Sequence, residues 1–176
     1  MDFVAARGVD GATVLEVGGG VGEIQLELLK RGAASTVNLE LSPAYEREAE
    51  TLLREAGFES RAQRRLHDIA VDPDAVEPAD VVVLNRVVCC YPDYERLLDA
   101  AAEKARRIVV FSHPPGNAIA RAFVAVENLG LRLARKEFRV FIHPPRAMLD
   151  VLRARGLQPV YAHHGVPFAV EGLERA

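Results

Sequence analysis

An open α/β sheet with right-handed crossovers, within a single globular domain over residues 1–176, is the fold that this sequence predicts. Short apolar runs at 14–17, 36–41, 81–84 and 108–111 suit parallel strands that are covered on both faces. Segments of helical period lie between these runs. With 49% hydrophobic residues, the 176-residue chain is long enough to form one substantial core.

Three helices are predicted between the strands, because apolar residues there share one helical face. The second begins at Ser42 and Pro43, an N-cap followed by a proline in the first turn, and Gly57 can end it in a left-handed conformation. Asp93 is likewise an N-cap before the third helix. The three apolar faces consist of Val21, Ile24 and Leu28; of Tyr45, Ala49, Leu52, Leu53 and Ala56; and of Tyr94, Leu97, Leu98 and Ala101.

The second half of the chain departs from this alternation. We expect residues 114–137 to form an inserted helical segment that covers the substrate site, since such insertions often do so. A strand is expected over Phe138 to Ile142, and a helix from Pro145 to Gly156. The end of the chain predicts an antiparallel hairpin around His164 and Gly165. The apolar positions of the insertion are Ile119, Phe123 and Val126.

Composition argues against several classes of partner. A formal charge of −3 gives no general attraction to nucleic acid or anionic membrane, and no apolar run approaches the length of a membrane span. Cys89 and Cys90 are adjacent, so they cannot join distant parts of the fold and lack the spacing of a zinc site. We therefore expect a cytoplasmic protein with no metal site, no membrane contact and no nucleic-acid partner.

The glycines in "VLEVGGGVGEIQLELL" are too dense for a simple turn between a strand and a helix, so they indicate a ligand that approaches the backbone closely. A phosphate-binding loop is excluded because the expected lysine is missing. A dinucleotide fingerprint would place its last small residue on Glu23 or Gln25, and an acid in the first helical turn would repel a pyrophosphate. The turn consists of Gly18, Gly19, Gly20 and Gly22.

The phrase "VLEVGGGVG" resembles the first motif of class I S-adenosylmethionine-dependent methyltransferases, an acid followed by G-x-G-x-G. Glu16, Gly18, Gly20 and Gly22 match that motif, and Gly19 lies in the same turn. In the family, the turn lies against the amino-acid and ribose parts of the cofactor, and the acid helps to organise the ammonium end. The resemblance therefore implies S-adenosylmethionine as the cofactor.

Three further phrases resemble the same family in the same order. "VNLELSP" is similar to the second strand, whose terminal acid holds both ribose hydroxyls; "LHDIA" resembles the loop whose acid receives the adenine amino group. "ADVVVLNRVVCCYPD" resembles the fourth strand and its exit, which border the cofactor and the reacting methyl. The cofactor-binding residues that these matches imply are Glu40, Leu41, Asp68, Ile69, Asn85 and Arg86.

The resemblance also implies a more specific fold and branch. The fold would be a Rossmann-like three-layer sandwich with a mostly parallel seven-stranded sheet and a C-terminal antiparallel hairpin. "VVCCYPD" and the insertion resemble the magnesium-protoporphyrin O-methyltransferase branch. Family members usually carry helices before the first strand. Either this chain is truncated there, or residues 116–136 do the covering.

Two residues are candidates for catalysis. His113 follows the fifth strand, where it can remove a proton from an acceptor, but it also fits a structural loop histidine before two prolines. Tyr91 either points into the pocket or packs as an aromatic side chain before Pro92. Cys89 and Cys90 are interpreted as small buried residues. The basic residues Arg132, Arg135, Lys136 and Arg139 bind an anion on the substrate or form a solvated face.

The function predicted from these observations is direct in-line methyl transfer to a small-molecule acceptor, with a homodimer left open. A different class also fits: a module with this fold that binds a cofactor or partner without catalysis. A nicotinamide-dependent oxidoreductase is a further alternative, against which Glu23 argues. A nucleic-acid methyltransferase is disfavoured by the acidic balance and by the lack of interleaved aromatic and basic residues.

Overall fold

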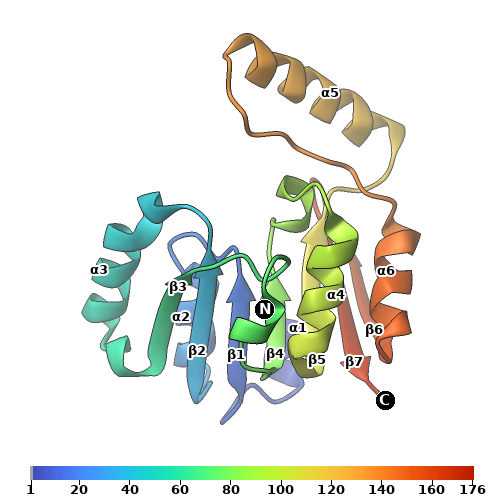
Figure 1. The fold of residues 1–176 in the computed structure, drawn as a ribbon. Helices are drawn as coiled ribbons and strands as arrows, with labels where there is room; N and C mark the ends of the chain where they lie inside the picture. The colour runs from blue at the N-terminus through green and yellow to red at the C-terminus, as the bar shows by residue number, and fades with distance from the viewer. Residues whose placement is uncertain (1) are drawn as a thin grey trace.

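The computed structural model describes residues 2–176, which contain one seven-stranded sheet in the order β3-β2-β1-β4-β5-β7-β6 (Figure 1). Strands β1 to β5 run parallel, whereas β7 pairs antiparallel with both β5 and β6. The predicted parallel sheet with a C-terminal antiparallel hairpin is therefore confirmed. The strands are β1 (Thr13–Val17), β2 (Ser35–Glu40), β3 (Ala62–Leu66), β4 (Ala79–Leu84), β5 (Ala105–His113), β6 (Leu157–His164) and β7 (Ala169–Arg175).

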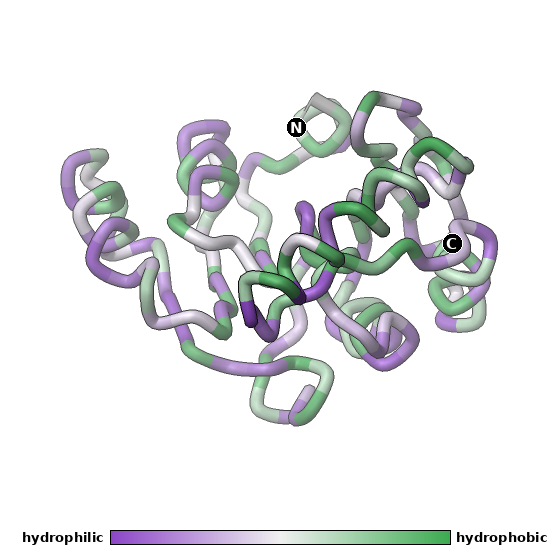
Figure 2. The backbone as a smooth tube through the Cα atoms, turned by 90° about the horizontal axis from the view of Figure 1, so that it is seen from above, coloured by the Kyte–Doolittle hydropathy of each residue, from purple (hydrophilic) through white to green (hydrophobic). Residues whose placement is uncertain are grey.

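Helices cover both faces of this sheet and make the three layers of a Rossmann-like fold (Figure 1). The helices are α1 (Asp2–Ala6), α2 (Glu23–Lys30), α3 (Glu46–Ala56), α4 (Tyr94–Lys104), α5 (Ala118–Leu133) and α6 (Pro145–Ala154). Viewed from above, helices around the sheet alternate hydrophobic and hydrophilic residues, as expected where only one face is buried (Figure 2).

The core consists of two clusters because strand residues point alternately to the two faces. Val14 and Val81 pack with α1 and α2 on one face, and Leu15 and Val82 pack with α4 and α6 on the other. These neighbouring valines and leucines are almost inaccessible to solvent. The continuous apolar runs of the sequence therefore form strands that are covered on both faces, as predicted.

The predicted helix boundaries follow from local capping. Ser42 accepts a hydrogen bond from the Ala44 amide, but the turn Pro43–Tyr45 is a 3₁₀ turn and α3 itself begins at Glu46. Gly57 ends α3 with φ 73°, a left-handed conformation that glycine adopts without strain. Asp93 caps α4 by accepting from the Arg96 amide. These capping signals therefore located the start or the end of each helix to within about one turn.

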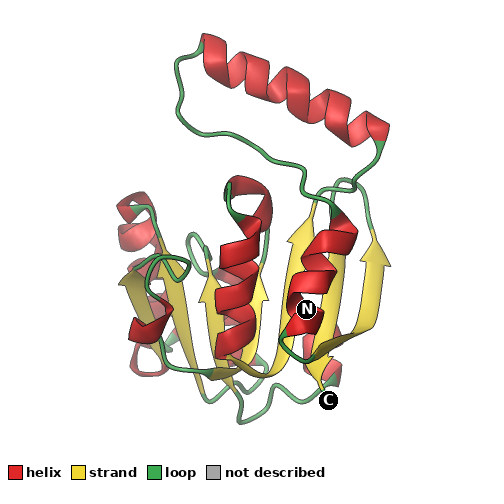
Figure 3. Cartoon of the chain, turned by 45° about the vertical axis from the view of Figure 1, so that its right-hand side comes forward, coloured by secondary structure: helices red, strands yellow, loops and turns green. Residues whose placement is uncertain are grey.

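The inserted segment contains a helix, as predicted, but the expected strand at Phe138 to Ile142 is wrong. Residues 134–144 return from α5 to α6 without joining the sheet (Figure 3). The Val140 amide donates to the Asn128 side chain at 2.9 Å, and the Phe141 amide donates to the Cys89 carbonyl at 2.7 Å. The backbone groups of Val140 and Phe141 are thus bonded to a side chain and to the Cys89 carbonyl rather than to a neighbouring strand.

Candidate functional site

A pocket of about 630 Å³ opens at the carboxyl ends of β1, β2 and β4, the edge at which open α/β sheets bind ligands. Many of the residues that the sequence nominated line this pocket, although they come from four separate segments. They are Gly18, Gly20, Glu40, Leu41, Asp68, Ile69, Arg86 and Tyr91. The other nominated residues, Glu16, Gly19, Gly22, Asn85 and His113, are not among its lining residues.

The glycine turn has the backbone conformation that its composition predicted. Gly18, Gly20 and Gly22 have φ values of 64°, 55° and 85°, a region that residues with a side chain rarely adopt. A Cβ atom on Gly18 would lie 2.3 Å from Val87, whereas a Cβ atom on Gly20 would meet no protein atom within 4 Å. Gly20 therefore leaves its side of the turn open to a ligand.

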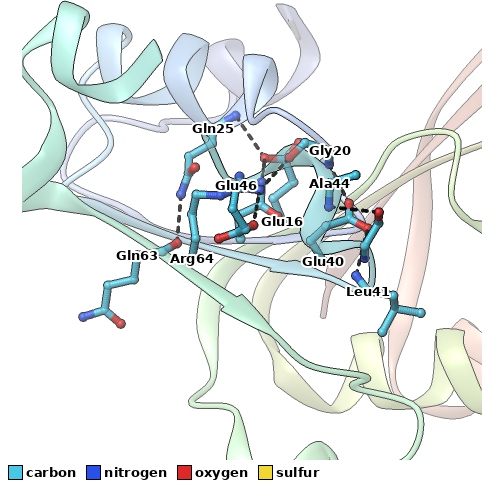
Figure 4. A network of polar contacts seen from close by, with 11 residues as sticks. Glu16, Gly20, Gln25, Glu40, Leu41, Ala44, Glu46, Gln63 and Arg64 are labelled. Carbon is cyan, nitrogen blue, oxygen red and sulfur yellow. Dashed lines mark hydrogen bonds and ion pairs between the residues drawn. The ribbon is translucent and has the colours of Figure 1, made fainter. Parts of the chain in front are cut away.

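Glu40 connects the glycine turn to the end of β2 (Figure 4). One carboxylate oxygen accepts from the Gly20 amide at 2.8 Å. The other accepts from the amides of Leu41 and Ser42 at 2.8 and 3.0 Å. Each oxygen can accept more than one bond, so these contacts orient the carboxylate and leave it able to receive ligand hydroxyls.

Asp68 lies on the opposite wall and is paired with Tyr91. One carboxylate oxygen accepts from the Ala70 amide, and the other accepts from the Tyr91 hydroxyl at 3.0 Å. Burial and this bond raise the pKa of Tyr91 to about 12, so the phenol keeps its proton at neutral pH. Of the two placements that the sequence left open for Tyr91, the structure shows features of both: it lines the pocket as a hydrogen-bond donor to Asp68 and packs against the core.

Glu16 lies beneath the glycine turn and is only 2% exposed. One of its oxygens accepts from the Gln25 amide at 3.1 Å and from the Asn38 side chain at 3.3 Å (Figure 4). Burial, more than any neighbouring charge, raises the pKa of Glu16 to about 8. A Cβ atom on Gly19 would lie 2.5 Å from the Glu16 carboxyl carbon, so these two residues fit together only because position 19 is glycine.

Arg64 is a site residue that the sequence reasoning missed. Its guanidinium donates to the Gly20 carbonyl at 2.7 Å and pairs with Glu46 of α3 at 3.0 Å, with only 6% of the side chain exposed (Figure 4). The only signal in the sequence was the arginine pair shortly before the phrase "LHDIA", which gave no indication of its target. Arg64 holds the glycine turn from the third strand.

The exit of β4 is bound to β5 and to the final hairpin. Ser112 accepts from the Arg86 amide at 2.7 Å and donates to the Asn85 side chain at 3.1 Å. Arg86 has a φ of 59°, unusual for a residue with a side chain, and its guanidinium lies 5.2 Å from the centre of the Phe168 ring. Arg86 borders the pocket, whereas Asn85 supports the turn that presents it.

The histidines differ in their positions. His113 is 4% exposed, donates from Nδ1 to the Pro114 carbonyl, and has Nε2 3.8 Å from Glu171, on the side of β5 where β7 pairs. His143 contacts the backbone carbonyls of Val88 and Tyr91 through Nε2. His67 lines the pocket, although the sequence reasoning nominated only the acid that follows it.

The two cysteines have different environments, so their interpretation as buried residues holds for only one of them. Cys89 is buried, whereas Cys90 is exposed and lines the pocket. Their sulfur atoms lie 3.7 Å apart. The hydrogen bond between them raises the pKa of the Cys89 thiol and lowers that of Cys90.

A pocket formed by a glycine turn and two carboxylates from successive strands is the arrangement expected of a methyltransferase, and comparison of the sequence supports this directly. Residues 1–162 match the family described as methyltransferase domain. The chain belongs to the methyltransferase domain family. The predicted membership in the class I S-adenosylmethionine-dependent methyltransferases is thereby confirmed, and S-adenosylmethionine is the cofactor of this family. A comparison with curated proteins gives no significant match.

Solved structures of methyltransferases share the fold at low sequence identity. The magnesium protoporphyrin IX methyltransferase from Synechocystis with bound SAH has 18% identity and a TM-score of 0.79, over 99% of this chain and 78% of that chain. An O-methyltransferase family protein from Burkholderia thailandensis has 19% identity and a TM-score of 0.79, over 99% of this chain and 55% of that chain.

A third methyltransferase shows that the likeness extends beyond O-methyltransferases. A putative sarcosine dimethylglycine methyltransferase from Galdieria sulphuraria has 12% identity and a TM-score of 0.78, over 99% of this chain and 83% of that chain. At these identities the likeness establishes the methyltransferase fold. Among residues 2–176, no helix is long and apolar enough to cross a membrane.

Proposed function

We propose that this chain binds S-adenosylmethionine in the pocket described above and promotes direct transfer of its methyl group to a small-molecule acceptor. The observation that carries the proposal is the convergence of the Gly20 turn, Glu40 and Asp68 on one pocket at the carboxyl edge of the sheet. When bound, the cofactor supplies an electrophilic methyl group on a sulfonium. No covalent attachment to the protein is needed, so the task of the chain is to orient the two reactants.

Each wall of the pocket has a part in binding. Gly20 lets the backbone approach the ligand, because no protein atom occupies the space where its side chain would lie. The oriented carboxylate of Glu40 accepts hydrogen bonds from the ribose hydroxyls, and Asp68 accepts from the adenine amino group. Leu41 and Ile69 add apolar surface for the flat base. Arg86 borders the side on which the acceptor enters.

Acceptor chemistry depends on how the proton of the acceptor is removed. Tyr91 keeps its own proton at neutral pH, and His113, the last residue of β5, is buried and does not line the pocket. For His113 to act as the base, the segment after β5 has to move so that the His113 imidazole faces the pocket. In the arrangement seen here, alignment of reactants is the main catalytic contribution, which favours acceptors that need no strong base.

Residues 114–137 cover the acceptor side in this proposal. Phe138, the residue directly after them, lines the pocket, and the Phe141 amide is bound to the exit of β4. The insertion therefore ends beside the site. The acceptor that we propose is a small molecule, and one matched solved structure is a magnesium protoporphyrin IX methyltransferase.

A module that binds the cofactor without catalysis is the second candidate, and the buried His113 favours it. Cofactor binding without turnover on any acceptor would support that alternative. A nicotinamide cofactor is disfavoured by Glu23 in the first turn of α2, which would face a pyrophosphate. A cytoplasmic location and the lack of a nucleic-acid partner are retained as parts of the proposal.

The test is calorimetric titration of S-adenosylmethionine into the wild type, Glu40→Ala and the control Glu50→Ala. Glu50 is an exposed acid on α3, so its removal matches the change in charge. We expect Glu40→Ala to lose about 1–3 kcal/mol of binding free energy, as for hydrogen bonds to a charged group, and Glu50→Ala to bind normally. Unchanged affinity in Glu40→Ala would remove Glu40 from the site. Formation of S-adenosylhomocysteine with a panel of acceptors then separates an enzyme from a binding module.

A further inference from the structure

One face of helix α5 packs against the rest of its own chain. Ala120, Val124, Asn128 and Leu131 are half-buried and recur at helical spacing. Asn128 anchors this face, because its side chain both donates to and accepts from the backbone of Val140. The rest of the helix is exposed, and none of its residues is buried.

A second face of α5 is apolar and has no partner within the described chain. Its members, which we call the outer stripe, are between 57% and 82% exposed. Figures 1 and 3 agree that α5 lies beyond the carboxyl ends of the strands, with no other helix beside it. A continuous apolar stripe of this size on a soluble surface marks a contact with another molecule. The outer stripe consists of Ile119, Phe123, Val126, Leu129 and Leu133.

The outer stripe is symmetric about its central residue. Ile119 and Leu133 each lie seven residues from Val126, and Phe123 and Leu129 each lie three residues from it. When two such helices pack antiparallel with Val126 on the two-fold axis, each large residue faces another large one. Ala122 and Gly130, each four residues from Val126, then face each other and allow the backbones to approach.

Charge favours the antiparallel arrangement and a protein partner. Arg132, Arg135, Lys136 and Arg139 gather at the C-terminal end of α5 and just after it, whereas residues 118–126 contain one charge, Arg121. A parallel pair would bring the two basic ends together, and an antiparallel pair separates them. A helix that lies on an anionic membrane usually has basic residues along its whole polar side, and here Glu127 interrupts it.

From these observations we propose that two copies of this chain associate through antiparallel α5 helices, with Val126 of each copy at the two-fold axis. The interface would fix the inserted segment of both protomers in place above their pockets. The partner is a second copy because the stripe is its own complement in length and side-chain size, and the antiparallel arrangement keeps the two basic ends apart. This inference does not depend on which ligand the pocket binds.

Sedimentation velocity over a concentration series tests the proposal with a matched pair of variants. Val126→Glu places a carboxylate on the outer stripe, and Ala125→Glu places the same group one residue away, on exposed surface outside it. We expect the wild type and Ala125→Glu to form dimers, and Val126→Glu to raise the dimer dissociation constant roughly a hundredfold or more. A wild type that stays monomeric, or equal dimerisation in both variants, would overturn the proposal.

Oxidative cross-linking tests the orientation of the helices. In a background of Cys89→Ala and Cys90→Ser, we expect Val126→Cys to form a disulfide between copies under a mild oxidant, because both copies meet at that position. Ile119→Cys faces Leu133 of the other copy and is expected not to cross-link alone. Cross-linking of Ile119→Cys as readily as Val126→Cys would indicate a parallel pair and overturn the antiparallel arrangement. A monomer that binds anionic vesicles through the stripe would assign the surface to lipid and overturn the proposal.

Discussion

Three carboxylates lie around the glycine turn, and their surroundings give them different tasks. Glu16 is buried beneath the turn and contacts only protein groups, among them the Asn38 side chain. Glu40 binds backbone amides and still borders the pocket, and Asp68 shares its carboxylate with the Tyr91 hydroxyl. The same carboxyl group therefore supports the turn in one case and prepares a surface for ligand in the other two.

Tyr91→Phe tests whether the phenol positions Asp68 or takes part in proton transfer. Loss of the hydroxyl removes one hydrogen bond from Asp68, the carboxylate expected to bind adenine. We predict that the KM for S-adenosylmethionine rises by about threefold to tenfold, with kcat close to that of the wild type. Steady-state kinetics with a working acceptor make this measurement. A large fall in kcat with unchanged KM would place Tyr91 in the chemical step instead.

Glu16→Gln should change how the stability of the protein depends on pH. The folded protein holds the Glu16 proton up to a pKa of about 8, against 4.5 for an ordinary glutamate, so the free energy of unfolding falls as pH rises through this window. Glutamine cannot lose that proton. We predict that the variant gains about 2–4 kcal/mol over the wild type between about pH 5 and pH 8. Urea unfolding at several pH values measures the gain, and a pH-independent difference between the two proteins would contradict it.

At the residue scale, two site residues were nominated through the family resemblance. The phrases "VNLELSP" and "LHDIA" implied Glu40 and Asp68, and the parallel strands bring both residues to one edge of the sheet. Arg64 could not be nominated, because its contact with the Gly20 carbonyl depends on a side chain that reaches the turn from β3. His113 was expected after the fifth strand but is the last residue of β5, and the pairing of β5 with β7 buries it.

At the scale of elements, the glycine turn meets two requirements, and each concerns a different glycine. Gly19 fits closely over Glu16 and Asn38, whereas Gly20 faces the open pocket. The first requirement concerns packing and the second concerns ligand access. Substitution of each glycine by alanine should therefore affect different properties.

We predict that Gly19→Ala lowers the free energy of unfolding by about 2–4 kcal/mol, because its Cβ atom would lie 2.3 Å from the Asn38 side chain. Gly20→Ala should cost only about 1–2 kcal/mol, the strain of a left-handed alanine, yet weaken cofactor binding more than tenfold. Urea unfolding and calorimetric titration of both variants measure the two effects. Equal losses of stability, with normal binding in Gly20→Ala, would contradict this division.

The one incorrect element shows what periodicity cannot resolve. Phe138 to Ile142 has the apolar composition of a strand, but Asn128 of α5 binds its backbone at Val140. An extended segment that pairs with a side chain and a segment that pairs with a strand look alike in sequence. Strands β1, β2, β4 and β5 were predictable because each contains an apolar run, and α3 and α4 because caps and apolar periodicity agreed. Strand β3 has no apolar run, and only the family resemblance implied it.

At the scale of the whole molecule, the order of the strands determines where a ligand can bind. The chain reverses direction across the sheet between β1 and β4, and the pocket lies where their carboxyl ends diverge. The family resemblance supplied the seven-stranded topology, which apolar periodicity alone did not determine, whereas the C-terminal hairpin was predicted from the end of the chain itself. The sequence predicted a helix in the inserted segment, but only the structure shows that the outer stripe of α5 is exposed.

Calorimetric titration of the purified protein with S-adenosylmethionine, S-adenosylhomocysteine and NAD, in parallel, decides which cofactor the pocket binds. We predict that both sulfur compounds bind with micromolar dissociation constants at one site per chain, and that NAD gives no heat of binding. Binding of NAD in competition with S-adenosylmethionine, or no binding of either sulfur compound, would contradict the assignment of the pocket.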